Sequence, residues 1–425
     1  MENKRCIFIS LPAGSHFRDI VKTGVLSKVS EMDNVKFIVV TPFFDDEDYR
    51  NEFSNINVIF EKMLDVRLNR LGRKIYSFCE KRLFVALLRS SKFFAFIWRE
   101  LLEVFLPISH YRKLLRNYKP QLVVINTAHK LIEVPILIAA NLEKIKNLCL
   151  LASWDNLQYS MGDKPNHLVV WNNEMVKVAL QKHKFRSNEI SVVGPPHFDF
   201  FYMEKYNEDR NSFFKRKNLD QNKRLITMAT SPPSFTTDNT FLIDLLLKGL
   251  EDGKIAQSVQ FLCRVHPLDD KNLYEKYKSD SRLILDIPIS NYNLTSWKTS
   301  DEGLLDLISS LKYSDILINV ASTITIEAAV FGTPVINIAF SNSEPERFRK
   351  QILIRHHQFH YKAVIESGGA RLAYKEQELF EFLNSYLEDR SLDEKGRKNL
   401  VNVLTNSCDG NTASRLAAKI LEHLV

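Results

Sequence analysis

The sequence contains few cysteines, and none of them are paired in a motif. They are scattered along the chain, and no Cys-x-x-Cys spacing occurs. An odd and dispersed set argues against a disulfide framework and is typical of a reducing compartment. We therefore interpret the following cysteines as free thiols of a cytoplasmic protein: Cys6, Cys79, Cys149, Cys263 and Cys408.

Long apolar runs are also absent. No window offers the roughly 18 consecutive apolar residues that a transmembrane helix needs, so we expect no membrane span. The polar start Met1–Arg5 leads into the apolar run Cys6–Ile9, which is too short for a signal peptide and is not followed by a small-residue cleavage site. Both absences favour a cytoplasmic location.

Several signatures of catalysis and cofactor binding are missing. There is no Gly-x-Gly-x-x-Gly fingerprint, no P-loop, no Gly-x-Ser-x-Gly elbow and no His-Glu-x-x-His motif. His356 and His360 are four residues apart, but without a glutamate between them we interpret their segment as a solvated or anion-facing basic surface. Basic and aromatic residues are not arranged as a nucleic-acid platform. We expect no metal, no cofactor and no nucleic-acid partner.

What the chain does have is the composition of a globular protein. Its 425 residues are 45% hydrophobic and 26% charged, and the formal net charge is +7. This length is too great for one ordinary core and suits two domains of roughly 200 residues each. The small positive excess suits anionic ligands or an anionic membrane surface without requiring either.

Short apolar runs alternate with helical segments in the first half of the chain. The runs are apolar throughout and bounded by turn residues, which is typical of parallel strands covered on both faces. This alternation favours an α/β fold with a doubly wound sheet. The expected strands are Cys6–Leu11, Val35–Thr41, Gln121–Asn126, Asn147–Ala152, His167–Trp171 and Ile190–Val193.

The alternation stops near Val193–Pro196, and the polar stretch Glu204–Arg224 precedes a second αβ series. We therefore expect one Rossmann-like domain over residues 1–203 and another over residues 204–405. Residues 406–425 are expected to form a C-terminal helix, which could pack back on the first domain. Ligands of such sheets bind beyond the carboxyl ends of the strands, so we expect the two domains to face each other across a cleft.

The segment Arg67–Tyr118 has helical periodicity and is rich in phenylalanine, leucine and basic residues. A basic amphipathic helix can lie on an anionic bilayer. The same pattern fits helices that cover the first sheet and turn their arginines to solvent. The sequence is compatible with both interpretations.

The strongest candidate site begins at Ser322 and Thr323, which follow the expected strand Asp315–Asn319. They stand where a helix begins, and a helix N-terminus suits phosphate because it carries unpaired N–H groups and partial positive charge. Thr325 adds a hydroxyl, and Glu327 lies one turn into the helix, where its carboxylate can accept from ribose hydroxyls. The alternative is structural: Ser322 caps the helix, and the negative charge of Glu327 interacts favourably with the helix dipole.

Two further segments follow strands in the second half. Arg264 and His266 stand at the end of one strand, and a cation beside an imidazole suits a diphosphate leaving group. Ser231 lies in the segment Thr230–Phe235 after another strand, where hydroxyls could contact a phosphate or a sugar. The alternatives are a histidine bonded near a turn and an ordinary proline-rich loop.

In the first half, Gly14, Ser15 and His16 follow the first strand. Gly14 permits a close backbone approach, and a neutral His16 could remove a proton from an acceptor hydroxyl. It could equally cap the next helix at the surface.

Trp154, Asp155 and Asn156 also follow a strand. Asp155 could act as a base or bind an acceptor hydroxyl. The alternative is an Asx turn with the tryptophan packed as a lid.

These segments resemble known enzymes. In the second half, the residues similar to the donor site of GT-B-fold glycosyltransferases are Arg264–Pro267, Ala321–Ala329 and Gly332–Asn337. In the first half, the residues similar to a bacterial branch of that fold, described as glycosyltransferase-like or CDP-glycerol glycerophosphotransferase-like, are Ala152–Leu157, Val170–Met175 and Val193–Asp199.

The resemblance implies a GT-B fold with inter-domain catalysis and no bound metal. It implies that Ser322, Thr323 and His266 face the donor phosphates and that Glu327 faces the ribose. Ser322-Thr323 stands where the related phosphotransferases have a Ser-Ser pair, and Glu327 replaces their usual aspartate, which leaves the donor open.

The resemblance implies that Asp155 and His16 lie on the acceptor side. In related glycerophosphotransferases a histidine of the N-terminal domain acts as the base, which favours His16. We thus take His16, Asp155 and His266 as candidate catalytic residues. The neighbours Gly14, Ser15, Trp154 and Asn156 are taken as acceptor-side residues.

We therefore expect a metal-independent glycosyltransferase that moves a sugar from a nucleotide-sugar donor to a saccharide or lipid-linked saccharide acceptor. The resemblance implies bacterial surface-polysaccharide or lipopolysaccharide assembly, with peripheral contact at the cytoplasmic face of the inner membrane. The alternatives are a CDP-glycerol or polyol-phosphate transferase, a nucleotide-sugar 2-epimerase of the same fold, and a non-catalytic nucleotide-binding subunit.

Overall fold

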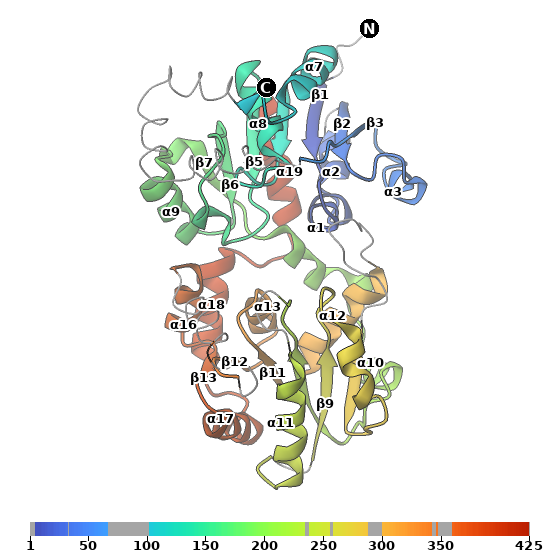
Figure 1. Ribbon diagram of the computed structural model, residues 1–425, viewed down its shortest axis with the longest axis vertical. Helices are drawn as coiled ribbons and strands as arrows, with labels where there is room; N and C mark the ends of the chain where they lie inside the picture. Colours follow the sequence, from blue (N-terminus) through green and yellow to red (C-terminus); the bar gives the residue numbers. More distant parts are fainter. Residues whose placement is uncertain are drawn as a thin grey trace. The chain divides into compact units, whose positions relative to one another are not determined.

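The computed structural model describes residues 5–32, 34–66, 102–233, 238–255, 258–287, 300–341, 346 and 359–424 (Figure 1). The chain divides into two compact units. Unit 1 comprises Met1–His197 and Asn411–Val425, and unit 2 comprises Phe198–Gly410. Among the described residues, no helix is long and apolar enough to cross a membrane.

Unit 1 is built on a seven-stranded sheet in which all neighbouring strands are parallel. The strand order is β3-β2-β1-β4-β5-β6-β7, so the winding direction reverses between β1 and β4. The strands are β1 (Arg5–Ser10), β2 (Val35–Thr41), β3 (Val58–Lys62), β4 (Leu122–Ile125), β5 (Lys146–Leu150), β6 (His167–Val170) and β7 (Ile190–Val192).

Helices cover this sheet because its central strands are apolar on both sides. Every residue of β4 is buried, and helix α8 is buried over most of its length between α7 and the strands β4 and β5. The helical segments are α1 (Gly14–Phe17), the π-helical turn η1 (Arg18–Lys22), α2 (Val25–Met32), α3 (Glu47–Asn51), α7 (Ile108–Tyr118), α8 (Val134–Leu142), α9 (Asn173–His183) and α19 (Thr412–Leu424).

Helix α19 returns the end of the chain to unit 1. It packs against α2 and the strand β5, as Figure 1 shows. Its apolar stripe is buried, and Arg415 donates from Nε to the carbonyl oxygen of Val193 at 2.9 Å. Residues 198–203, which the sequence pattern assigned to the first domain, belong to unit 2, where Phe200 packs with Tyr206 on the helix α12 (Asp301–Tyr313).

Unit 2 contains a six-stranded parallel sheet with the order β10-β9-β8-β11-β12-β13. Its winding reverses between β8 and β11. The strands are β8 (Arg224–Ala229), β9 (Val259–Arg264), β10 (Leu283–Asp286), β11 (Ile316–Asn319), β12 (Val335–Ile338) and β13 (Arg371–Ala373).

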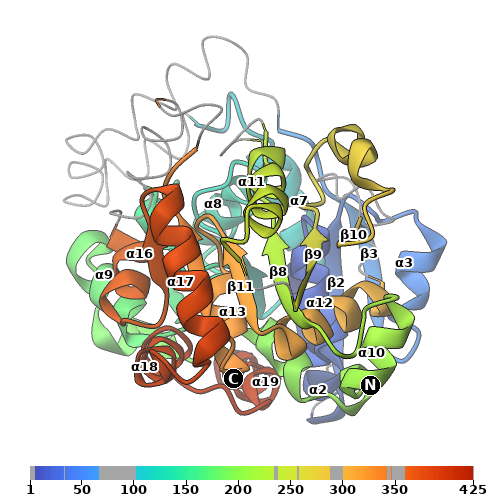
Figure 2. The same ribbon diagram turned by 90° about the horizontal axis from the view of Figure 1, so that it is seen from below.

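The two faces of this sheet bury alternate residues of each strand. Ile226 and Phe261 pack with helices α11 and α17, which lie over one face (Figure 2). Leu225 and Leu262 pack with Phe213 of α10 on the other. The helices are α10 (Arg210–Arg216), α11 (Thr240–Glu251), α12 (Asp301–Tyr313), α13 (Ile324–Val330), α16 (Phe359–Glu366), α17 (Glu376–Glu388) and α18 (Glu394–Thr405).

Both units therefore have the alternation of parallel strands and helices that the sequence predicted. The reversal in each sheet matters for function, because ligands of open α/β sheets bind beyond the carboxyl ends of the two strands that flank it.

Candidate functional site

In unit 2 the reversal lies between β8 and β11, which pair in register from Ile316 to Ile318. The segment Thr230–Pro233 follows β8, and the segment Val320–Thr323 follows β11. The chain therefore places two of the predicted donor segments at the position where this kind of sheet binds ligands. His266 follows β9, which pairs with β8 on its other side.

The loop after β8 is held in place by Asn239, which lies directly before α11. Asn239 accepts from the backbone N–H of Ser231 at 3.0 Å and donates to its carbonyl oxygen at 2.9 Å. Asn239 and Thr230 both donate to the buried carboxylate of Asp269, at 2.7 and 3.2 Å. The two bonds to Asn239 therefore fix the backbone of Ser231. Its hydroxyl is largely shielded, because the residue is only 5% exposed.

His266 is fixed in one tautomer by its neighbours. Its backbone N–H donates to Oγ1 of Thr230 at 2.7 Å, and its ring Nδ1 accepts from the backbone N–H of Leu268 at 3.1 Å. Burial lowers the pKa of His266, although the charge of Asp269 opposes this. The ring is therefore neutral near pH 7, with its proton on Nε2, and acts there as a hydrogen-bond donor.

Arg264 ends β9 and lies opposite Asp286, the last residue of β10. Its guanidinium pairs with the Asp286 carboxylate and donates to the carbonyl oxygen of Gly303 at 3.2 Å. Lys217 donates to the same carboxylate at 3.0 Å. Burial alone would raise the pKa of Asp286, but the positive charges of Arg264 and Lys217 lower it below its usual range.

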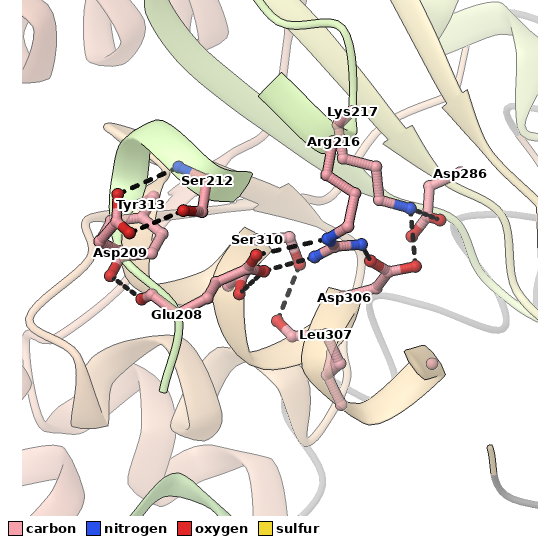
Figure 3. A network of polar contacts seen from close by, with 12 residues as sticks. Glu208, Asp209, Ser212, Arg216, Lys217, Asp286, Asp306, Leu307, Ser310 and Tyr313 are labelled. Atoms are coloured by element: carbon pink, nitrogen blue, oxygen red, sulfur yellow. Dashed lines mark hydrogen bonds and ion pairs between the residues drawn. The ribbon is translucent and has the colours of Figure 1, made fainter. Parts of the chain in front are cut away.

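This ion pair belongs to a longer network of alternating charges, most of which Figure 3 shows. Lys217 also pairs with Asp306 at 2.6 Å, Asp306 pairs with Arg216, and Arg216 pairs with Glu208. Three cations face three carboxylates, so the network is neutral as a whole. Arg264 is thus held at its end by contacts within unit 2.

The helix that was predicted after β11 is short. Helix α13 spans seven residues, and Thr323 at its N-cap makes no side-chain cap bond. Oγ of Ser322 lies 3.5 Å from the N–H of Ile324, a long contact for a cap. Ser322 is exposed, and Thr323 and Glu327 are half-buried, so these side chains are reachable from outside unit 2.

Thr325 is placed differently, because its side chain is fully buried. Its Oγ1 lies 3.0 Å from Nδ2 of Asn319, 3.1 Å from Oδ1 of Asn337 and 3.1 Å from the hydroxyl of Tyr361. This cluster ties α13 to the ends of β11 and β12. The contacts support a positioning role for Thr325 rather than direct donor contact.

In unit 1 the reversal lies between β1 and β4, and the segment Gly14–His16 follows β1. Ser15 is exposed, whereas Gly14 is buried and His16 is 2% exposed. Burial and the charge of Lys130 lower the pKa of His16 to about 4, with Nδ1 buried and without a hydrogen-bond partner. A base with this pKa and so little access is poorly matched to proton transfer near pH 7.

The loop after β4 is organised by a buried carboxylate that the sequence pattern did not single out. Glu133 accepts from the backbone N–H of Asn126 at 2.9 Å and from the hydroxyl of Thr127 at 3.0 Å. Burial raises its pKa, although these hydrogen bonds oppose the shift. A lone glutamate inside an apolar helical segment was the available signal in the sequence.

Asp155 lies after β5 and is half-buried, while its neighbours Trp154 and Asn156 are 7% and 8% exposed. Oδ1 of Asn156 accepts from the backbone N–H of Ser153 at 2.9 Å, so Asn156 shapes the turn. Asp155 is close to His129, which lies in the loop after β4. Burial lowers the pKa of His129 to about 4, although the charge of Asp155 opposes this shift.

His129 stacks on the ring of Tyr159 with centroids 4.8 Å apart, and Tyr159 is 51% exposed. This stacked pair lies near Asp155, and the sequence analysis missed it. The signal was available, since His129 follows an expected strand just as Asp155 does.

Within unit 2 the fold gathers Ser231, Arg264, His266, Ser322 and Thr323 at the carboxyl ends of neighbouring strands. Over the described parts of the chain, no group of three or more metal-ligating side chains is found. His356, residues 67–101 and 291–299 and most of 340–349 lie outside the described residues, and His360 is described only as a backbone position of α16.

Comparisons with known proteins bear on the family and the fold of the chain. The family described as CDP-Glycerol:Poly(glycerophosphate) glycerophosphotransferase matches residues 46–422. No curated protein sequence matches the chain at a significant level.

Several solved structures are similar in fold. The UDP-GlcNAc 2-epimerase from Neisseria meningitidis, bound to UDP-GlcNAc, has a TM-score of 0.60 and 13% identity, covering 99% of this chain and 100% of that chain. A glycosyltransferase from Rickettsia africae has a TM-score of 0.52 and 14% identity, covering 99% and 98%. The wall teichoic acid polymerase TagF has a TM-score of 0.52 and 13% identity, covering 99% and 88%. These likenesses confirm the expected GT-B fold.

Proposed function

Because the chain belongs to the CDP-glycerol:poly(glycerophosphate) glycerophosphotransferase family, we propose that it transfers a polyol-phosphate group from a CDP-activated donor to a hydroxyl of a cell-surface glycan. The chain is an enzyme of the glycosyltransferase type, as the sequence predicted. Within that type, the family match over most of the chain favours the CDP-polyol donor over the sugar nucleotide that was first expected. The acceptor polymer then resembles a teichoic acid more than a lipopolysaccharide.

The observation that carries the assignment of the donor phosphates to unit 2 is the fixed tautomer of His266 beside the reversal of the second sheet. A neutral Nε2–H can donate to a phosphate oxygen as charge moves onto the departing CMP, and it needs no proton exchange to do so. The exposed Ser322, in the loop after β11, supplies a further hydroxyl donor.

The reaction requires one bond to form and one to break. The acceptor oxygen forms a bond to the phosphorus that carries the polyol, the bond from that phosphorus to the bridging oxygen breaks, and CMP leaves with the electron pair. The hydroxyl proton passes to a base. We assign this role to Asp155 rather than His16, because Asp155 is accessible and His16 is 2% exposed.

The first experiment is a thermal-shift screen with CDP, CMP, UDP, GDP and dTDP, each with and without EDTA. A ligand at about 100 times its Kd stabilises the fold by about 2.7 kcal/mol. We expect shifts with CDP and CMP that EDTA does not change, which is the metal-independent behaviour that we propose. Release of CMP from CDP-glycerol in the presence of acceptor would then identify the chemistry.

The other outcomes assign other functions. A shift with UDP and turnover of UDP-sugars only in the presence of acceptor would restore the glycosyltransferase with a sugar donor. Conversion of a lone UDP-sugar to its epimer would identify an epimerase. Binding without turnover of any donor would identify a non-catalytic subunit.

We also propose that the enzyme works at the cytoplasmic face of the inner membrane, on a lipid-linked acceptor. The support is the net charge of +7 and the basic amphipathic pattern of residues 67–118. Co-sedimentation with anionic vesicles, compared with neutral vesicles, tests this. Equal recovery in the pellet with both would contradict it.

A further inference from the structure

Unit 1 contains a pocket with charged and amide side chains in its lining, which the proposed reaction does not use. Its volume is about 720 Å³, within the range of ligand-binding pockets. The charged and amide side chains that line it are Asn141, Lys144, Lys164, Asn166, Arg186 and Glu189.

This pocket lies at the amino ends of three strands. Lys144 comes just before β5, Asn166 just before β6 and Glu189 just before β7. The candidate acceptor residues around Asp155 follow the carboxyl end of β5. The five residues of that strand span about 16 Å, so the pocket is separate from the candidate active site.

The lining carries three cations and one carboxylate. Glu189 pairs with Lys164 at 3.0 Å and with Arg186 at 2.7 Å. Burial alone would raise the pKa of Glu189, but hydrogen bonds from the Arg186 backbone and from both cations lower it to about 2. Lys144 is exposed and has no ion pair among the described residues, so the pocket keeps an excess of positive charge.

The walls are held by a set of asparagine contacts. Asn166 accepts from the backbone N–H of Asn147 at 3.0 Å, and its own N–H donates to Oδ1 of Asn147 at 2.8 Å. Nδ2 of Asn147 donates to Oδ1 of Asn141 at 2.8 Å. Since Oδ1 of Asn166 is the accepting atom, its Nδ2 can donate to a ligand in the pocket.

A structural explanation exists for part of this charge. Lys144 follows the C-terminus of α8 with a left-handed backbone, and a cation there favours the helix dipole. That effect needs one cation at one helix end. It does not account for cations from three separate loops that converge on one pocket of this size.

We propose that this pocket binds the phosphate groups of a poly(polyol phosphate) chain, at a second site apart from the candidate active site. The cations and the Asn166 amide suit phosphate oxygens, and the volume admits more than one phosphate-bearing unit. The identity of the chain as the polymer being extended rests on the proposed function, whereas phosphate binding does not. A second site would keep the growing polymer on the enzyme between additions.

The test is the affinity of the full chain for a short synthetic oligo(glycerol phosphate), measured by calorimetry without donor. Lys144→Glu should weaken binding about tenfold, as expected when one charge-assisted hydrogen bond is lost. Lys144→Arg should keep it. Lys62→Glu is the matched control, because Lys62 ends β3 at the opposite edge of the same sheet.

A second measurement does not depend on variants. Mass spectrometry of lysine acetylation should show that the oligomer protects Lys144 and Lys164 but not Lys62. Inorganic pyrophosphate and an uncharged maltose oligomer are the comparison ligands. Weak protection by pyrophosphate with none by maltose would identify the repeated phosphates of the polymer as the feature that binds.

Two results would overturn the proposal: unchanged affinity in Lys144→Glu, or equal affinity for the uncharged oligomer. Tighter binding of pyrophosphate than of the oligo(glycerol phosphate) would assign the pocket to a small phosphate instead. CMP release from CDP-glycerol is measured separately. If the protein binds the oligomer but releases no CMP from CDP-glycerol, the proposed function is contradicted and the pocket assignment still holds.

Discussion

The backbone N–H of Leu268 can only donate, so the Nδ1 of His266 that accepts from it carries no proton. The neutral ring then presents Nε2–H to a ligand. We predict that His266→Ala lowers kcat by about 10²-fold, the cost of removing one donor to a developing negative charge. Steady-state kinetics with CDP-glycerol checks this.

The conservative control is His266→Gln, whose side-chain N–H can replace the Nε2–H donor. We expect it to recover part of the lost kcat with little change in Tm. Equal activity of both variants would show that hydrogen-bond donation from this position is not used. A large loss of Tm in His266→Ala would point to a structural role.

Asp286 lies between two cations, and its neutralisation removes the carboxylate that pairs with Arg264, whereas Lys217 keeps its pair with Asp306. We predict that Asp286→Asn destabilises unit 2 by about 3 kcal/mol, the typical effect of breaking a buried ion pair from one side. The control is Glu251→Gln, which breaks the exposed pair with Arg282 and should cost less than about 1 kcal/mol. Urea unfolding of the three proteins makes the comparison, and equal midpoints would contradict it.

The positions of the candidate residues could be predicted, but their exposure could not. Residues that follow a strand come out at the carboxyl edge of the sheet, which identified Asp155, His266 and Ser322. Burial depends on long-range packing, so nothing local indicated that Thr325 faces Tyr361 or that His16 is covered.

The helix α19 docks on unit 1 through a histidine pair. The rings of His167 and His423 are 4.2 Å apart, and Nε2 of His167 contacts Oγ of Ser191 at 2.9 Å. Burial and the neighbouring His423 lower the pKa of His167 to about 4, and burial lowers that of His423, although Glu422 opposes the latter. Lys419 and Lys146 add further positive charge nearby.

This pair predicts a loss of stability in acid. Above about pH 7 both histidines are neutral in the folded and unfolded chains, so they contribute no pH dependence. As the pH falls below about 6.5, these histidines bind protons in the unfolded chain but not in the folded chain. The free energy of unfolding therefore decreases towards pH 4. We predict that His423→Phe, which keeps a ring but cannot titrate, reduces the fall in Tm between pH 7 and pH 5 by about 2–4 °C. Parallel Tm curves for the two proteins would contradict the assignment.

At the level of elements, the sequence was informative because short apolar runs and capping residues are local signals. Asn172 caps α9 by accepting from the N–H of Met175 at 2.9 Å, and such a start can be found by inspection. The π-helical turn Arg18–Lys22 could not be found in this way, because no local pattern separates it from an α-helix.

The chain crosses between its two units twice, so one unit is formed by a continuous stretch of sequence and the other is not. Unit 2 is a single stretch, Phe198–Gly410, whereas unit 1 needs residues from both ends. Alternation of strands and helices predicted two sheets. The docking of the last helix rests on contacts between residues far apart in the sequence, such as Arg415 with Val193, and no local pattern specifies these.

This difference predicts how fragments behave. Residues 198–410 should fold alone, because the core of unit 2 is contained in that stretch. Residues 1–197 should aggregate, because without α19 the surface that buries Leu416, Ala417 and Ile420 is left open. Circular dichroism and gel filtration of the two fragments check this, with residues 1–197 linked to 411–425 as the matched control that should regain solubility. If unit 2 holds the donor as proposed, the 198–410 fragment should also keep the thermal shift with CMP. A folded fragment without that shift would mean that the nucleotide needs residues of unit 1.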